Sequence, residues 1–142
     1  VTVFCGILNF RTGEVRYSNA GHNPPLVLGP GRPPEWLALP EGFLLGTMED
    51  SAYETRQIIL APGDTLLLYT DGVTEAMNGD KRFYEERRLV EVTQEHRQDR
   101  PEQLVGEVLR SVRAFAGNEP QSDDITMLAL AYRGRSENPS LP

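Results

Sequence analysis

Two acidic motifs of this sequence have the residue type and the position needed to bind a divalent cation. In the first, Asp71 and Gly72 directly follow the run 66–70 (LLLYT), which is expected to be a buried strand. A buried strand there would hold the carboxylate at a fixed place and angle, and hard divalent cations need oxygen ligands that are placed rigidly. The glycine would relieve crowding beside the carboxylate. An aspartate followed by glycine is also a common turn signal, so an ordinary turn is the alternative.

The second motif is Asp123 and Asp124, which precede the apolar run 125–132. Two adjacent carboxylates repel each other unless a cation or hydrogen-bond donors offset their charge. Asp71 and Asp123 lie far apart in the sequence, so only tertiary folding could bring them together, and neighbouring central strands would do so. The alternative is a solvated acidic loop between a helix and a strand.

Strands and helices that could position these motifs can be predicted from the spacing of apolar residues and turn signals. The predicted strands are 1–8, 15–19, 26–28, 36–39, 56–60, 65–69 and 125–132, and the predicted helices are 85–96 and 101–116. The strand 65–69 is expected to be buried on both faces, and the strands up to residue 39 are expected to form an antiparallel meander. Strands that precede helices, with one returning strand, predict an α+β fold in which helices cover antiparallel sheet.

Composition sets limits on the classes of function. The formal net charge of −7 argues against a nucleic-acid partner, and no apolar run has the length of a membrane segment. The N-terminus lacks the pattern of a secretion signal, so we expect a cytoplasmic protein. Two histidines and one cysteine disfavour a structural zinc site, and Cys5, in an apolar run, is expected to be a buried thiol. Residues 1–133 are expected to belong to one domain and 134–142 to form a disordered tail.

Four segments, taken together, resemble one protein family. These are 17–25 (YSNAGHNPP), 60–64 (LAPGD), 68–76 (LYTDGVTEA) and 123–126 (DDIT). In composition and order they resemble the SpoIIE-type branch of the metal-dependent (type 2C-like, PPM) bacterial protein serine/threonine phosphatases. The resemblance extends from residue 1 to about residue 133, and four motifs in order are far more specific than one.

The resemblance implies an αββα sandwich of antiparallel sheets covered by helices, with two Mn²⁺ or Mg²⁺ ions between the sheets. It implies that Asp71 and Asp123 are metal ligands. The implied supporting residues are Asp124, Asn19, Gly21, His22, Gly72 and Thr126. The implied reaction is hydrolysis of phosphoserine or phosphothreonine by a metal-activated water.

The resemblance also implies partners and a missing segment. The substrate would be a phosphorylated regulatory protein such as an anti-sigma factor antagonist, and a sensor or receiver domain would precede the phosphatase domain. The first metal motif of the family, an Asp-x-x-Gly-x-Gly-like segment, would lie before Val1. We therefore expect the N-terminal part of the fold to be missing and this chain alone to have little activity. Two alternatives are a non-catalytic, phosphatase-like interaction module in signalling and an unrelated α+β domain.

Overall fold

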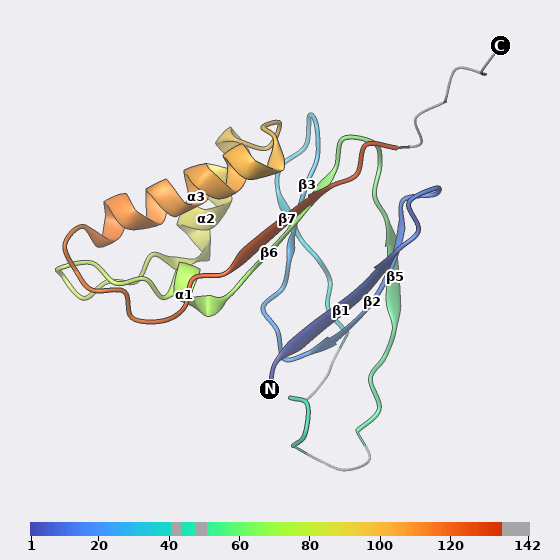
Figure 1. Cartoon of the computed structure of the whole chain (residues 1–142), viewed down its shortest axis with the longest axis horizontal. Coiled ribbons are helices and arrows are strands. Elements are labelled where there is room, and N and C mark those ends of the chain that lie inside the picture. Colours follow the sequence, from blue (N-terminus) through green and yellow to red (C-terminus); the bar gives the residue numbers. More distant parts are fainter. Residues whose placement is uncertain (41–43, 48–50, 135–142) are drawn as a thin grey trace. The chain divides into compact units, whose positions relative to one another are not determined.

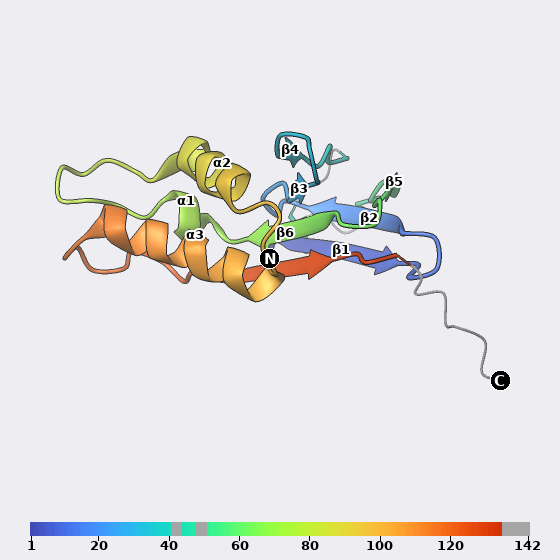
Figure 2. The ribbon, with the colours of Figure 1, turned by 90° about the horizontal axis from the view of Figure 1, so that it is seen from above.

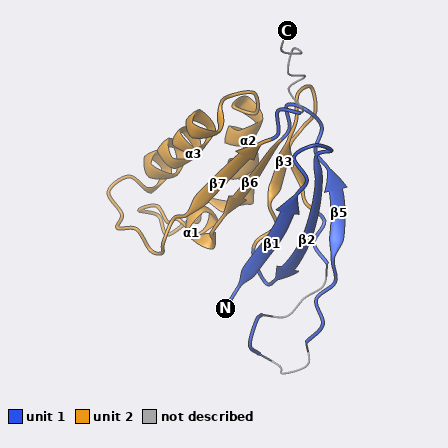
Figure 3. Cartoon of the chain, turned by 45° about the vertical axis from the view of Figure 1, so that its right-hand side comes forward, with its two compact units in different colours: residues 1–22, 38–64, 132–142 blue, residues 23–37, 65–131 orange. Residues whose placement is uncertain are grey.

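The structure is a computed structural model that describes residues 1–40, 44–47 and 51–134. The chain divides into two compact units, coloured separately in Figure 3. Unit 1 contains residues 1–22, 38–64 and 132–142, and unit 2 contains residues 23–37 and 65–131. The expected disordered tail lies outside the described residues, apart from residue 134.

Unit 1 is built on a three-stranded antiparallel sheet. Its strands, in spatial order, are β1 (Val3–Leu8), β2 (Glu14–Ala20) and β5 (Arg56–Ile59). The turn between β1 and β2 is closed by the Gly13 N–H, which donates to the carbonyl of Asn9 at 2.9 Å. Gly13 has φ +77°, and a Cβ there would lie 2.3 Å from the Leu60 carbonyl oxygen. The Thr12-Gly13 turn signal therefore has a steric cause, because only glycine fits this position.

Unit 2 is built on a four-stranded antiparallel sheet. Its strands, in spatial order, are β4 (Glu35–Trp36), β3 (Leu26–Leu28), β6 (Thr65–Tyr69) and β7 (Met127–Ala131). Four of the five residues of β6 are buried, as predicted, because β6 is a central strand that pairs with both β3 and β7. It can therefore position the residues that follow it.

Three helices belong to unit 2 (Figure 1): α1 (Asp71–Thr74), α2 (Glu85–Glu95) and α3 (Pro101–Ala116). Figure 2 shows α2 and α3 side by side. Their apolar residues pack with residues of β3 and β6 in one core. This core contains Leu26, Leu28, Leu67, Tyr69, Val73, Ala76, Tyr84, Leu89, Leu104, Val108 and Val112. The helical spacing read in 101–116 is thus the spacing of the residues that α3 buries.

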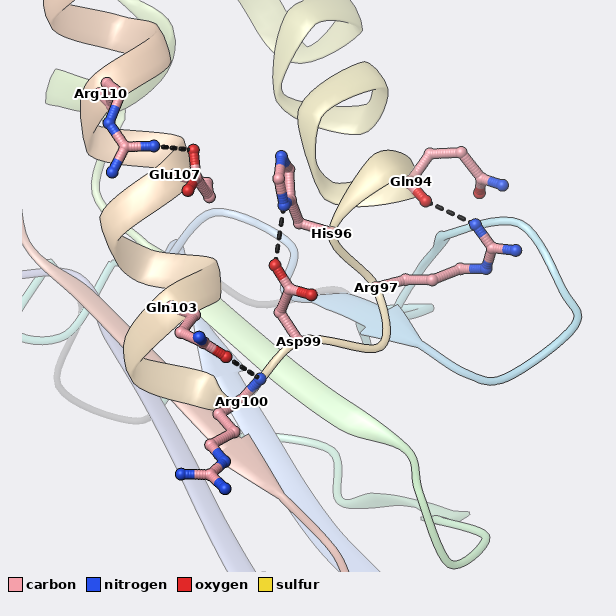
Figure 4. A network of polar contacts seen from close by, with 8 residues as sticks. All are labelled: Gln94, His96, Arg97, Asp99, Arg100, Gln103, Glu107 and Arg110. Carbon is pink, nitrogen blue, oxygen red and sulfur yellow. Dashed lines mark hydrogen bonds and ion pairs between the residues drawn. The ribbon is translucent and has the colours of Figure 1, made fainter.

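Polar contacts organise the turn between α2 and α3, as Figure 4 shows. His96 Nδ1 lies 2.8 Å from Asp99 Oδ2 just after the end of α2. The Arg100 N–H donates to Gln103 Oε1 at 3.3 Å, which satisfies one free donor at the start of α3. Pro101 at the first helical position needs no donor partner. These local contacts lie at the end of α2 and the start of α3, and the predicted bounds there agree with the structure to within one residue.

Two expectations were wrong. The first four strands do not form one meander, because β2 pairs with β5 whereas β3 pairs with β4 and β6. Pro24 and Pro25 separate β2 from β3, and proline has no N–H to donate to a ladder. Cys5 is exposed rather than buried. It lies on β1, which is at the edge of its sheet, so an apolar run did not imply burial there.

The predicted α+β class, with antiparallel sheets and helices, is confirmed. None of the helices in the described ranges combines the length and the apolar character that a membrane span requires.

Candidate functional site

Strand pairing brings the two acidic motifs together. The last pair of the β6–β7 ladder joins Tyr69 to Met127, and the Thr70 N–H then donates to the Thr126 carbonyl at 3.0 Å. Asp71 is the residue after Thr70. Residues 125 and 126 separate the pair Asp123 and Asp124 from the start of β7. The two motifs, distant in sequence, therefore lie at the same end of one strand pair, as the sequence analysis had suggested.

Thr70 ties the two motifs to each other. Its hydroxyl donates to the Asp124 carbonyl at 2.7 Å, and its Oγ1 accepts a hydrogen bond from the Thr126 N–H at 2.9 Å. The sequence predicts a supporting role for Thr126 but not for Thr70. A threonine at the end of a strand gives no signal of its own, and the only available hint was its position next to Asp71.

Gly72 allows the backbone of α1 to approach the loop before β7. A Cβ on this residue would lie 2.6 Å from the Asp124 carbonyl oxygen and 3.1 Å from that of Asp123. Both distances involve backbone atoms, which cannot rotate away as a side chain can. The close approach of Asp71 to the second motif thus requires glycine at position 72.

The carboxylates of Asp71, Asp123 and Asp124 are exposed. One oxygen of Asp71 accepts the Gly72 N–H at 3.1 Å, and one oxygen of Asp123 accepts the Asp124 N–H at 2.6 Å. Within residues 1–40, 44–47 and 51–134, no arginine, lysine or histidine forms an ion pair with Asp71, Asp123 or Asp124. Their negative charges are therefore available to a cation.

The neighbouring phenol adds no charge. Tyr69 is buried, and burial, with a smaller contribution from the negative Glu86, raises the pKa of its phenol well above the ordinary value. Tyr69 therefore stays neutral at physiological pH. The negative charge at this end of β6 and β7 comes from the aspartates.

The donor set fits one hydrated hard cation better than an enclosed pair of ions. Over the described residues, no three histidine, cysteine, aspartate or glutamate side chains form a group able to hold a metal ion. Mg²⁺, however, keeps several waters and commonly uses only one or two carboxylates. Asp71 and Asp123 could supply these, whereas a second ion would need further donors.

The remaining predicted site residues form a separate group in unit 1. Asn19 is 6% exposed, and its Nδ2 donates to the His22 carbonyl at 3.1 Å. The Asn19 Oδ1 is buried and has no hydrogen-bond partner. Gly21 has φ +74° and closes the loop between them. The structure thus brings Asn19, Gly21 and His22 together as a loop-forming set, and it brings Asp71, Gly72, Asp123, Asp124 and Thr126 together in unit 2.

We expect Thr70→Val to destabilise unit 2 by about 2 kcal/mol, since it removes two hydrogen bonds worth about 1 kcal/mol each. Thr70→Ser is the matched control, because serine keeps the hydroxyl and should retain most of the wild-type stability. Chemical denaturation of the three proteins measures the difference. A valine variant as stable as the wild type would show that Thr70 does not hold the two motifs together.

Comparisons with known proteins identify the family. Residues 1–133 match the family described as Stage II sporulation protein E (SpoIIE). The chain belongs to the SpoIIE family. It is 31% identical over 132 residues to Protein IcfG of Synechocystis sp., covering 93% of this chain and 20% of that protein. It is 25% identical over 130 residues to Phosphoserine phosphatase RsbU of Bacillus subtilis, covering 92% of this chain and 38% of RsbU. It thus spans well under half of either relative.

Several solved structures share the fold. The RsbU and RsbW domains of Rv1364c from Mycobacterium tuberculosis align with a TM-score of 0.74 at 24% identity, covering 94% of this chain and 36% of that one. The phosphatase domain of SpoIIE from Bacillus subtilis, presoaked in Mn, aligns with a TM-score of 0.71 at 14% identity, covering 99% and 59%. At such identities the likeness establishes the fold. Family and fold together exclude the unrelated α+β domain.

Proposed function

We propose that this chain forms part of a metal-dependent protein phosphatase that hydrolyses phosphoserine or phosphothreonine on a regulatory protein. The observation that carries the proposal is the meeting of Asp71 and Asp123 at one end of β6 and β7, where neither aspartate forms an ion pair with a basic residue of the described ranges. A structural ion pair would have placed an arginine or lysine beside them. Membership of the SpoIIE family supports the proposal, since relatives include a phosphoserine phosphatase.

In this proposal Asp71 and Asp123 hold the metal, and the residues around the two aspartates keep them at a fixed distance from each other. Asp71 and Asp123 would each supply a carboxylate oxygen to Mn²⁺ or Mg²⁺, while Thr70 and Gly72 hold the two backbone segments together. The ions, two in the complete domain, would lower the pKa of a bound water and offset charge on the phosphoryl oxygens during in-line attack. Asp124 would support the site through its backbone carbonyl, which accepts from Thr70.

The partner we propose is a phosphorylated anti-sigma factor antagonist. This follows from the family, one relative being a structure that combines an RsbU domain with an RsbW domain. A sensor or receiver domain in the same polypeptide and a cytoplasmic location belong to the same proposal. The chain's own acidity favours a partner that presents no large acidic surface apart from its phosphate.

The proposal is tested by phosphate release. The full-length protein, incubated with a phosphoserine-bearing antagonist and Mn²⁺, should release inorganic phosphate, and a chelator should stop the reaction. A phosphotyrosine peptide of similar charge serves as the comparison substrate and should be hydrolysed far more slowly. The absence of phosphate release with both Mn²⁺ and Mg²⁺ would refute the proposal.

One observation favours a second candidate, a non-catalytic interaction module. The described residues assemble no group of three potential metal ligands. Such a module would bind the phosphoprotein without turnover and without any gain from a divalent ion. Calorimetric titration of the full-length protein with Mn²⁺ distinguishes the two, because only the enzyme requires saturable binding that depends on Asp71 and Asp123.

A further inference from the structure

A pocket of about 100 Å³ lies in unit 2 directly beside the two acidic motifs. Its walls come from three places: the segment from α1 to residue 77, the last turns of α3, and the loop from α3 to β7. The lining residues are Gly72, Ala76, Met77, Val112, Arg113, Ala116, Gly117, Glu119, Pro120, Gln121, Ser122 and Ile125. Nothing in the proposed hydrolysis uses this pocket.

Two residues that line the pocket are the chain neighbours of the aspartates in the candidate site. Gly72 follows Asp71 in the chain, and Ser122 precedes Asp123, so consecutive Cα atoms place each wall residue about 3.8 Å from an aspartate Cα. A phosphoprotein whose phosphate binds the metal that Asp71 and Asp123 would hold must pass its neighbouring residues close to the mouth of the pocket. Residues of an extended chain are spaced by about 3.3 Å, so a residue within three positions of the phosphoserine would reach it.

Polar residues (Arg113, Glu119, Gln121 and Ser122) form part of the lining, and the volume together with the apolar part of the lining indicates the type of side chain that fits. A cavity of about 150 Å³ with apolar walls accepts benzene, so a pocket of this smaller size suits a branched aliphatic side chain better than a phenyl ring. The side chains of Met77, Val112, Ala116 and Ile125 supply apolar contacts. Arg113 is exposed and forms no ion pair within the described part of the chain. The pocket is therefore not occupied by a buried salt bridge of this arginine.

Polar contacts connect the segments that surround the pocket. Lys81 Nζ pairs with Glu119 Oε2 at 3.1 Å and joins the turn at 78–82 to the loop after α3. Asn78 Oδ1 accepts the N–H groups of Asp80 and Arg82 and fixes that turn. Gln121 Nε2 donates to the Asp123 carbonyl at 2.8 Å. A preformed pocket loses little conformational entropy on binding, which favours selectivity.

We propose that this pocket receives one aliphatic side chain (valine, leucine or isoleucine) of the phosphoprotein, within three residues of the phosphoserine. It is a specificity pocket, and the proposal rests on the phosphatase function proposed above. The pocket lies beside both motifs, so it selects the segment around the phosphoserine rather than a distant surface of the partner.

The test uses the full-length protein with Mn²⁺ and a set of phosphoserine peptides. Each peptide has alanine at the three positions on either side of the phosphoserine, except for one position that holds leucine or phenylalanine. At one position, leucine is expected to raise kcat/KM roughly tenfold over alanine, the scale at which a hydrophobic pocket discriminates small aliphatic groups, and phenylalanine should give less. p-Nitrophenyl phosphate, which has no such side chain, measures basal hydrolysis.

Ala116→Leu fills the pocket, and Ala114→Leu is its matched control. Ala114 lies on the same helix but lines a different surface groove, between α2 and α3. We expect Ala116→Leu to bring the leucine-to-alanine ratio of kcat/KM close to one and to leave p-nitrophenyl phosphate hydrolysis within about twofold. Ala114→Leu should retain the wild-type ratio. If circular dichroism shows that Ala116→Leu is unfolded, Ser122→Leu on the exposed loop replaces it.

A measurement of peptide binding tests the specificity pocket independently of phosphatase activity. Fluorescence anisotropy with Mn²⁺ and peptides that carry a non-hydrolysable phosphonate in place of the phosphate measures the affinity for leucine and alanine peptides without turnover. If no peptide and no p-nitrophenyl phosphate is hydrolysed, the phosphatase function fails, and the anisotropy ratio still decides the pocket. The specificity pocket is overturned if the wild type shows no aliphatic preference at any position, or if folded Ala116→Leu keeps the preference.

Discussion

Asp71→Asn and Asp123→Asn are each expected to lower metal-dependent phosphate release by roughly a thousandfold. Each variant weakens binding of the metal ion, whose positive charge stabilises the transition state by several kcal/mol, and each 1.36 kcal/mol changes the rate tenfold. Asparagine keeps the size of aspartate and an oxygen that can accept the Gly72 or Asp124 N–H. The fold should therefore persist. Steady-state kinetics with Mn²⁺, together with thermal unfolding of each variant, measure the two effects separately.

Asp80→Asn is the control for the loss of one negative charge. Asp80 is exposed in the turn at 78–82. Its variant should match the wild type in both rate and Mn²⁺ affinity. Asp71→Asn or Asp123→Asn with full activity would remove that aspartate from the proposed metal site, and equal losses in all three variants would point to net charge rather than to ligation.

Local features of the fold could be predicted because local physics determines them. The helix 101–116 was predicted with its observed bounds, because proline begins it, glycine follows it and its apolar residues recur at the helical period. The strand before Asp71 was predicted because a run of four apolar residues suits a central strand buried on both faces. These signals lie within a few residues of the element they predict.

Strand partners could not be predicted in the same way. The separation of β2 from β3 depends on pairings with β5 and β6, which lie far along the chain. The exposure of Cys5 depends on the place of β1 at the edge of its sheet, and this place is a property of the whole sheet. Composition reports the apolar character of a strand, but it does not report how many neighbours the strand has.

The candidate site likewise combines residues that local sequence patterns predict with residues whose role depends on distant parts of the chain. Asp71 and Asp123 could be selected because a carboxylate beside a predicted buried strand is a local pattern, and the family resemblance strengthened the choice. Thr70 could not be selected, since its function is to bond with the backbone of residues 124 and 126 across two strands. The glycine at position 72 suggested a need for space, but the atoms it makes space for belong to a segment distant in sequence.

Gly72→Ala is expected to destabilise unit 2 by about 2 kcal/mol, the scale of forced overpacking, because its Cβ would lie 2.6 Å from the Asp124 carbonyl oxygen. To relieve this contact, α1 must move away from the loop that carries Asp123. A displacement of about 1 Å at a reacting centre costs on the order of a hundredfold in rate. We therefore expect phosphate release to fall by about a hundredfold even at temperatures where the variant remains folded.

Gly106→Ala provides the matched control for this substitution. Gly106 lies in α3, and a Cβ there would point into open space. Alanine in a helix interior should therefore raise stability by up to about 1 kcal/mol and leave phosphate release unchanged. Opposite shifts of the two variants in thermal unfolding would separate a steric clash from a general effect of replacing glycine. If Gly72→Ala were as stable and as active as the wild type, the close approach of the two acidic motifs would not depend on a missing side chain at position 72.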